Sequence, residues 1–124
     1  MIDYSEQGQK MKEILEHSLE LARVGNELRD KQGAIAVIKA LYVMEVAAVT
    51  RPDGKPQYTN ESIRDAAVVL RCAEDKEYKS TLALINTLRE RQALLEGRLY
   101  VFKQRQEFVR LQIVHDLVVL EKVA

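Results

Sequence analysis

The sequence predicts an all-α protein: a long antiparallel helical hairpin with a short intervening helix, coiled-coil-like and oligomeric. Three observations predict this fold. Apolar residues recur at spacings of seven, or of three and four, on both sides of one loop, which is the repeat of an amphipathic helix. Both prolines, Pro52 and Pro56, fall inside that loop, and no stretch alternates apolar and polar residues as a strand does. Because the chain has 124 residues, we expect a single helical domain over residues 1–124.

The first helix is predicted over about residues 4–49. From Ala34 to Val49 nearly every position is apolar, with Lys39 and Glu45 as interruptions, a pattern typical of a helix that is covered on several sides. A hairpin of two helices cannot cover this segment alone, so the segment and the last helix are the predicted surfaces of a homo-oligomer. The apolar stripe of the first helix consists of Ile14, Leu21, Leu28, Ile35, Ile38, Tyr42 and Val49.

A loop is predicted over residues 50–59, because Pro52-Asp53-Gly54 combines the three residue types that favour a tight turn. Thr59 is then the expected N-cap of a short helix over about residues 60–73. Tyr58 and Ile63 fall at the positions of a hydrophobic staple around that cap.

The last helix is predicted over about residues 76–122, with Asp75 as its N-cap. With Ile85 at heptad position a, most a and d positions are apolar, which predicts an extended helical seam. The polar exceptions, Gln92, Gln106 and Asp116, are of the kind that fixes register or oligomer number. The a and d positions are Tyr78, Thr81, Ile85, Leu88, Gln92, Leu95, Leu99, Phe102, Gln106, Val109, Ile113, Asp116 and Leu120.

Composition and charge exclude several classes of protein. Lys+Arg and Asp+Glu both number 19, so the net charge is zero and no global field draws the chain to nucleic acid or to an acidic surface. A single cysteine, Cys72, cannot form an intramolecular disulfide and reads as a buried core residue. The N-terminal residues lack the pattern of a signal peptide, and the apolar segment from Ala34 to Val49 is too short to span a bilayer. We therefore expect a cytoplasmic protein with no membrane partner.

Basic residues gather locally on the last helix. From Lys79 to Arg110 there are seven basic and three acidic residues, and most of the basic ones flank the seam at e and g positions. Two interpretations stay open: these side chains pair with the acidic first helix, within or between subunits, or they hold an external phosphate backbone. The basic residues concerned are Arg89, Arg91, Arg98, Lys103, Arg105 and Arg110; the acidic ones are Glu6, Glu13, Glu16, Glu20 and Glu27.

No catalytic or metal-binding motif is present in the sequence. Gly54-Lys55 lacks the other residues of a phosphate-binding loop, and neither a nucleophile elbow nor a dinucleotide fingerprint occurs. Glu16 directly precedes His17, so the Glu-x-x-His pairs of di-iron bundles are missing, and an acidic helix face is the simpler interpretation of these residues. We expect no enzyme activity, no cofactor and no bound metal.

The segment from Gly54 to Arg64, continuing to Tyr78, resembles a pattern in small helical proteins of phages and integrated elements. Its core is Lys55-Pro56-Gln57-Tyr58-Thr59-Asn60-Glu61, which matches a Lys-Pro-x-Tyr-Ser/Thr-Asn-Glu loop. The layout of long helix, loop, short helix and long helix also resembles UvsY-type recombination mediators. That resemblance implies an oligomer that binds single-stranded DNA and helps to load a recombinase, with Lys55, Tyr58, Asn60 and Arg64 as the positions to carry over.

Together these observations give two functional hypotheses. The first is an accessory protein of phage-type DNA recombination or replication that binds single-stranded DNA without sequence preference, with a recombinase or single-strand-binding protein as partner, in the host cytoplasm if phage-encoded. The second is a structural or assembly adaptor that contacts proteins only. The candidate nucleic-acid-binding residues are Lys55, Arg64, Arg89, Arg91, Arg98, Lys103, Arg105 and Arg110, with Tyr58 and Asn60 as loop-motif residues.

Overall fold

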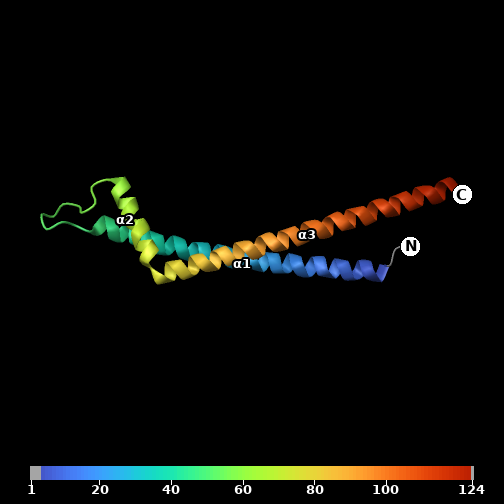
Figure 1. Ribbon diagram of the computed structural model, residues 1–124, viewed down its shortest axis with the longest axis horizontal. Coiled ribbons are helices and arrows are strands. Elements are labelled where there is room, and N and C mark those ends of the chain that lie inside the picture. Colours follow the sequence, from blue (N-terminus) through green and yellow to red (C-terminus); the bar gives the residue numbers. More distant parts are fainter. Residues whose placement is uncertain (1–3, 124) are drawn as a thin grey trace. The chain divides into compact units, whose positions relative to one another are not determined.

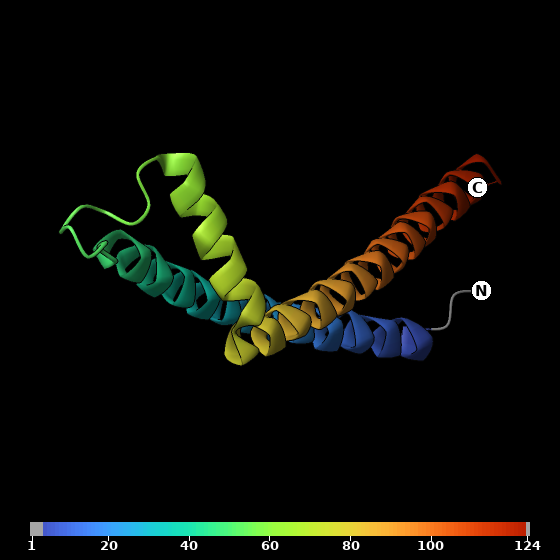
Figure 2. The ribbon, with the colours of Figure 1, turned by 60° about the vertical axis from the view of Figure 1, so that its left-hand side comes forward.

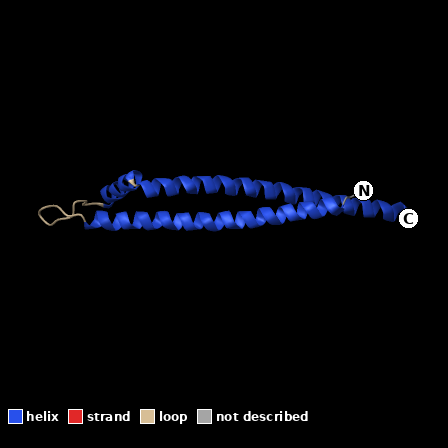
Figure 3. Ribbon diagram, turned by 90° about the horizontal axis from the view of Figure 1, so that it is seen from below, coloured by secondary structure: helices blue, strands red, loops and turns tan. Residues whose placement is uncertain are grey.

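The computed structural model describes residues 4–123, and these form three helices (Figure 1). Helix α1 covers Tyr4–Ala48, α2 covers Glu61–Glu74 and α3 covers Lys76–Val123. One loop, between α1 and α2, interrupts the helices (Figure 3). The prediction of an all-α protein is confirmed for the described residues, which contain no strand beyond an isolated bridge between Thr50 and Pro56. Each helix bound lies within one residue of the predicted one.

The described residues divide into two compact units. The terminal unit contains α1 up to Val24 and α3 from Arg91 onward, and the central unit contains residues Gly25–Glu90. The central unit therefore holds the loop, α2 and the adjoining parts of α1 and α3. Each unit is described by itself below.

The loop contains the predicted Pro-Asp-Gly turn. The N–H of Gly54 donates to the carbonyl of Arg51 at 2.9 Å, and the N–H of Arg51 donates to the carbonyl of Lys55 at 2.7 Å. A carboxylate oxygen of Asp53 accepts from the N–H of Lys55 at 3.0 Å. Gly54 has a φ of 81°, a left-handed conformation that is readily available only to glycine.

The N-cap predicted for α2 is wrong by one residue. The side chain of Asn60, not Thr59, accepts from the N–H of Ile63 at 2.8 Å, and α2 begins at Glu61. Thr59 and Asn60 are both good capping residues, so local preference did not separate them. With the cap at Asn60, the pair of Tyr58 and Ile63 no longer occupies the two staple positions.

Asp75 joins α2 to α3. Its carboxylate accepts from the N–H of Tyr78 at 2.7 Å, which confirms the predicted N-cap of α3. Its own N–H donates to the carbonyls of Arg71 and Cys72, two of the last four carbonyls of α2. One residue thus satisfies groups at both helix ends, and the chain changes direction sharply between α2 and α3 (Figure 2).

The core of the central unit brings α1 and α2 together. Val46 from α1 is 1% exposed, and Ala67, Val68 and Cys72 from α2 are also buried. Three tyrosines, Tyr42, Tyr58 and Tyr78, pack against this cluster. Cys72 is a buried free thiol, which confirms its interpretation as a core residue.

Most residues of the predicted apolar stripe of the first helix and of the predicted seam of the last helix are shielded from solvent. Every a and d position of α3 from Tyr78 to Ile113 is buried or half-buried, whereas Asp116 and Leu120 are exposed. Leu95 is fully buried and Leu99 is 6% exposed. Each residue of the predicted stripe of the first helix is also buried or half-buried, including Val49, which lies just beyond the end of α1.

Many other apolar side chains remain exposed. On α1 they include Val37, Leu41 and Met44, from the segment predicted to be covered on several sides. On α3 they concentrate beyond Phe108. Among the described residues, no helix meets the length and apolarity of a membrane-spanning segment.

Candidate nucleic-acid interface

The candidate basic residues are distributed over both units. Arg91, Arg98, Lys103, Arg105 and Arg110 lie on α3 in the terminal unit, whereas Lys55, Arg64 and Arg89 lie in the central unit. Within the terminal unit the structure brings Arg98 and Arg105 to one groove. Seven residues separate them, which is about 10 Å along a helix, so both project from the same face of α3.

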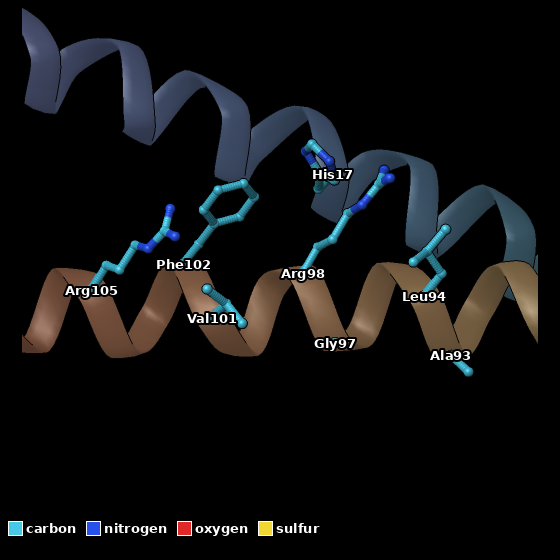
Figure 4. A pocket seen from close by; sticks show the side chains of 8 residues that line it. All are labelled: His17, Ala93, Leu94, Gly97, Arg98, Val101, Phe102 and Arg105. Atoms are coloured by element: carbon cyan, nitrogen blue, oxygen red, sulfur yellow. The ribbon is translucent and has the colours of Figure 1, made fainter.

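The basic groove of the terminal unit has a volume of about 630 Å³. Gly97 is part of its lining, and a Cβ added at this residue would point into open space. Figure 4 shows Phe102 and Arg98 extending from α3 toward α1, on either side of His17. The full lining is His17, Ala93, Leu94, Gly97, Arg98, Val101, Phe102 and Arg105.

His17 is oriented by two contacts. Its Nδ1–H donates to the carbonyl of Glu13 at 2.8 Å, because a carbonyl can only accept. Its ring meets that of Phe102 edge-on, with centroids 5.3 Å apart and an interplanar angle of 72°. This is a favourable aromatic geometry, and it fixes one wall of the basic groove.

A second groove adjoins the first and shares Arg105 and Val101 with it. It has a volume of about 520 Å³, and Lys10 of α1, whose Nζ lies 3.1 Å from Oε1 of Glu6, also lines it. Two aromatic side chains of its lining, Tyr100 and Phe108, are 64% and 68% exposed. Exposed aromatic rings therefore lie beside Arg105, a combination that suits both the bases and the phosphates of a single strand.

Arg91 is held by the acidic first helix. Its Nη2 lies 2.5 Å from Oε1 of Glu20, and its Nε donates to the same oxygen at 3.0 Å. The hydrogen bond from Arg91 lowers the pKa of Glu20, and the charges of Arg91 and Arg23 act in the same direction. For Arg91, the structure thus favours pairing with α1 over an external anion.

Arg110 is also paired, but within its own helix. Its Nη2 lies 2.6 Å from Glu107 Oε1 at a spacing of three residues. Glu107 raises the pKa of Arg110, and Arg110 lowers that of Glu107, chiefly through this hydrogen bond. An exposed pair of this kind contributes little to stability.

The remaining candidates have no carboxylate partner within residues 4–123. No ion pair joins Arg89, Arg98, Lys103 or Arg105 to a described acidic residue, and the same holds for Lys55 and Arg64. Arg98 and Arg105 of this set line one groove together. They are the strongest candidates for an external anion.

The loop-motif residues divide between structural and exposed positions. Tyr58 packs against the central core, and Asn60 caps α2, so both have structural roles that account for their presence. The side chains of Lys55 and Arg64 are exposed. These four residues belong to the central unit, and none of them is among the residues that line the basic groove.

Sequence reasoning did not find two polar contacts of the central unit. The hydroxyl of Tyr42 donates to Asp75, and Arg71 Nη1 lies 2.6 Å from Oε1 of Glu45. Tyr42 was expected in the core stripe and Asp75 as a cap, but their contact depends on how α1 meets the junction of α2 and α3. The hydrogen bond raises the pKa of Tyr42 to about 12 and lowers that of Asp75.

The described residues hold no group of three or more His, Cys, Asp or Glu side chains placed to bind a metal ion. The side chains of His17 and Glu20 make the contacts described above, with Phe102 and Arg91 respectively. Comparisons with models of protein families, with curated proteins and with solved structures found no match to this chain.

Proposed function

We propose that the protein is a non-enzymatic, oligomeric accessory factor of phage-type DNA recombination or replication that binds single-stranded DNA without sequence preference. A recombinase or a single-strand-binding protein is the expected protein partner, and the host cytoplasm is the expected location. The observation that carries the proposal is the basic groove, in which Arg98 and Arg105 face solvent without a carboxylate partner among the described residues.

The surroundings of these arginines support a single strand over a duplex. Phe102 lines the basic groove, and the exposed rings of Tyr100 and Phe108 line the adjoining one. Aromatic rings stack on unpaired bases of any sequence, while arginines follow the backbone. A duplex hides its bases from such rings.

The proposed layout is an antiparallel, coiled-coil-like helical hairpin. Two contacts in the terminal unit support it: Glu20 meets Arg91, and His17 meets Phe102. The position on α3 rises as the position on α1 falls, as it does in two helices of opposite direction. The burial of the heptad a and d positions of α3 between Tyr78 and Ile113 also supports this layout.

A protein-only adaptor remains the second candidate function. The exposed apolar residues of α3 favour it, since Phe108, Leu111 and Leu117 are each more than half exposed. Apolar surface of this kind marks protein contacts. The two candidate functions predict different results with an oligonucleotide: a DNA-binding factor binds it at low salt, whereas a protein-only adaptor does not.

A fluorescently labelled single strand titrated at several salt concentrations tests the proposal. We expect binding at low salt and an affinity that falls steeply as salt is added. The double variant Arg98→Gln, Arg105→Gln should flatten the plot of log affinity against log salt by about 1.4 per bound subunit, since each lost phosphate contact on a single strand removes about 0.7.

The matched control is Lys12→Gln, Lys76→Gln, which changes net charge equally at two exposed positions outside both grooves. This control variant should keep nearly the full wild-type slope of log affinity against log salt. Absence of binding at low salt would reject DNA binding and favour the adaptor. Equal slopes for both double variants would reject the basic groove as the site.

A further inference from the structure

The C-terminal part of α3, residues 111–123, exposes apolar side chains around the whole helix. Leu111, Leu117 and Leu120 are 53%, 60% and 65% exposed, and Val123 is 81% exposed. A helix that is apolar all round is normally buried. We call residues 111–123 the apolar end of α3.

The apolar end continues a seam that is already occupied upstream. Heptad positions a and d from Leu95 to Ile113 are buried or half-buried, whereas the next positions, Asp116 and Leu120, are exposed. The same repeat thus passes from a protected to an unprotected stretch of one helix. Continuity of the repeat indicates that another helix covers it in the same way.

The total surface of the chain indicates how much a partner has to cover. The accessible surface is 9467 Å², whereas a compact monomer of 14.2 kDa exposes about 6,800 Å². The excess is about 2,700 Å² per chain, or about 5,400 Å² for two chains, which is more than the roughly 2,000–5,000 Å² that an obligate interface removes from two chains together. Two chains therefore have enough exposed surface to form a stable homodimer.

We propose that the apolar end of α3 pairs with the same segment of a second copy in the antiparallel direction. A second copy fits because it brings an identical unsatisfied surface, and a two-fold axis closes the pair. The inference deepens the assembly named in the proposed function, for which it supplies the contact surface. It does not depend on DNA binding.

The negative charge of Asp116 on the seam determines whether the two helices pair in a parallel or an antiparallel direction. In a parallel, in-register pair, Asp116 at position d meets Asp116 of the second copy, so that two carboxylates face each other in an apolar seam. Like charges in such a position are unfavourable. In an antiparallel pair, position a faces position d of the partner helix, so each Asp116 lies against Leu120 of the other copy.

Light scattering tests the proposed contact between two copies. It measures the mass of the full chain in solution across micromolar concentrations. We expect at least twice the chain mass of 14.2 kDa. The variant Leu117→Glu, Leu120→Glu should lower the mass, and Leu84→Glu, which is 49% exposed on the same helix outside the apolar end, should leave it unchanged. A monomeric wild type, or a double variant of unchanged mass, would overturn the proposal.

Direction is tested by disulfide trapping in a Cys72→Ala background, with helix content checked by circular dichroism. Leu120→Cys protein should crosslink poorly with itself but readily with Asp116→Cys protein, because a disulfide needs Cα atoms within about 7 Å. Efficient self-crosslinking of Leu120→Cys would instead show a parallel pair. No DNA is present in either experiment, so their failure is separable from failure of the DNA-binding proposal.

Discussion

At the scale of single residues, Tyr42 and Asp75 form the one hydrogen bond that ties α1 to the start of α3 within the described part of the central unit. The other carboxylate oxygen of Asp75 accepts from the N–H of Tyr78. The bond stabilises ionised Asp75 and protonated Tyr42, which is why the pKa of Asp75 falls and that of Tyr42 rises to about 12. Both shifts connect stability to pH.

Replacing Tyr42 with phenylalanine should lower stability in a pH-dependent way. A lowered carboxyl pKa contributes stability above the ordinary value of 3.8, and a raised tyrosine pKa contributes stability below the ordinary value of 10.0. The difference between wild type and Tyr42→Phe is therefore greatest between these values. It should shrink as the pH falls below 3.8 or rises from 10.0 toward 12.

Urea unfolding of the two proteins over this pH range measures that difference. Tyr100→Phe is the matched control, because Tyr100 is 64% exposed and no hydrogen bond joins its hydroxyl to another described residue. The control should track the wild type at every pH. A constant offset for Tyr42→Phe across the whole range would contradict the assignment of the hydrogen bond.

Leu94 and Leu95 are neighbours with opposite surroundings. Leu95 is fully buried, whereas Leu94 is 46% exposed. Leu95→Ala should cost about 2–5 kcal/mol of unfolding free energy, as buried leucine truncations do. Leu94→Ala should stay within about 0.5 kcal/mol of the wild type. Thermal unfolding at one fixed protein concentration distinguishes the two, and equal losses would contradict the assignment of the seam.

At the scale of the elements, the start of α2 depends on one capping side chain. Asn60→Ala should destabilise the protein by about 1 kcal/mol, because the N–H of Ile63 then loses its acceptor. Thr59→Ala is the matched control and should have a smaller effect. Urea midpoints at neutral pH measure both, and a larger loss for Thr59→Ala would restore Thr59 as the cap.

The helices could be predicted from the sequence because their signals are local. The Pro-Asp-Gly turn, the cap at Asp75 and the heptad repeat all act within a few residues, and the described bounds lie within one residue of the predicted ones. The cap of α2 was assigned wrongly because Thr59 and Asn60 offer similar side-chain acceptors. Packing of Tyr58 against the central core is a tertiary contact that local preference does not contain.

The site could be predicted only in part, because it depends on the register between α1 and α3. The sequence gives an excess of arginines beside an acidic helix, but not which arginine each glutamate meets. A shift of two turns would exchange Arg91 for Arg98 opposite Glu20. The observed pair, Arg91 with Glu20, leaves Arg98 and Arg105 available.

At the scale of the whole molecule, a net charge of zero means that only local concentration can attract a polyanion. One basic groove offers two arginines, which is few for tight binding. The proposed assembly of copies repeats the groove along one strand. Linked sites of this kind gain about 10²–10⁴ in apparent affinity without any new contact.

The variant Leu117→Glu, Leu120→Glu should therefore weaken binding to long strands although it retains both arginines. An oligonucleotide of about eight nucleotides has the size of one binding site, so a single subunit binds it. On this short strand, the variant and the wild type should differ in affinity only through the charge of the two added glutamates. On a strand several times longer, linked grooves are lost and the affinity should fall at least tenfold more. The variant Leu111→Glu, Val114→Glu adds the same charge within the apolar end but outside positions a and d, and a smaller loss on long strands is expected for it. Equal losses on short and long strands would show that each subunit binds independently, and the link between assembly and DNA binding would be wrong.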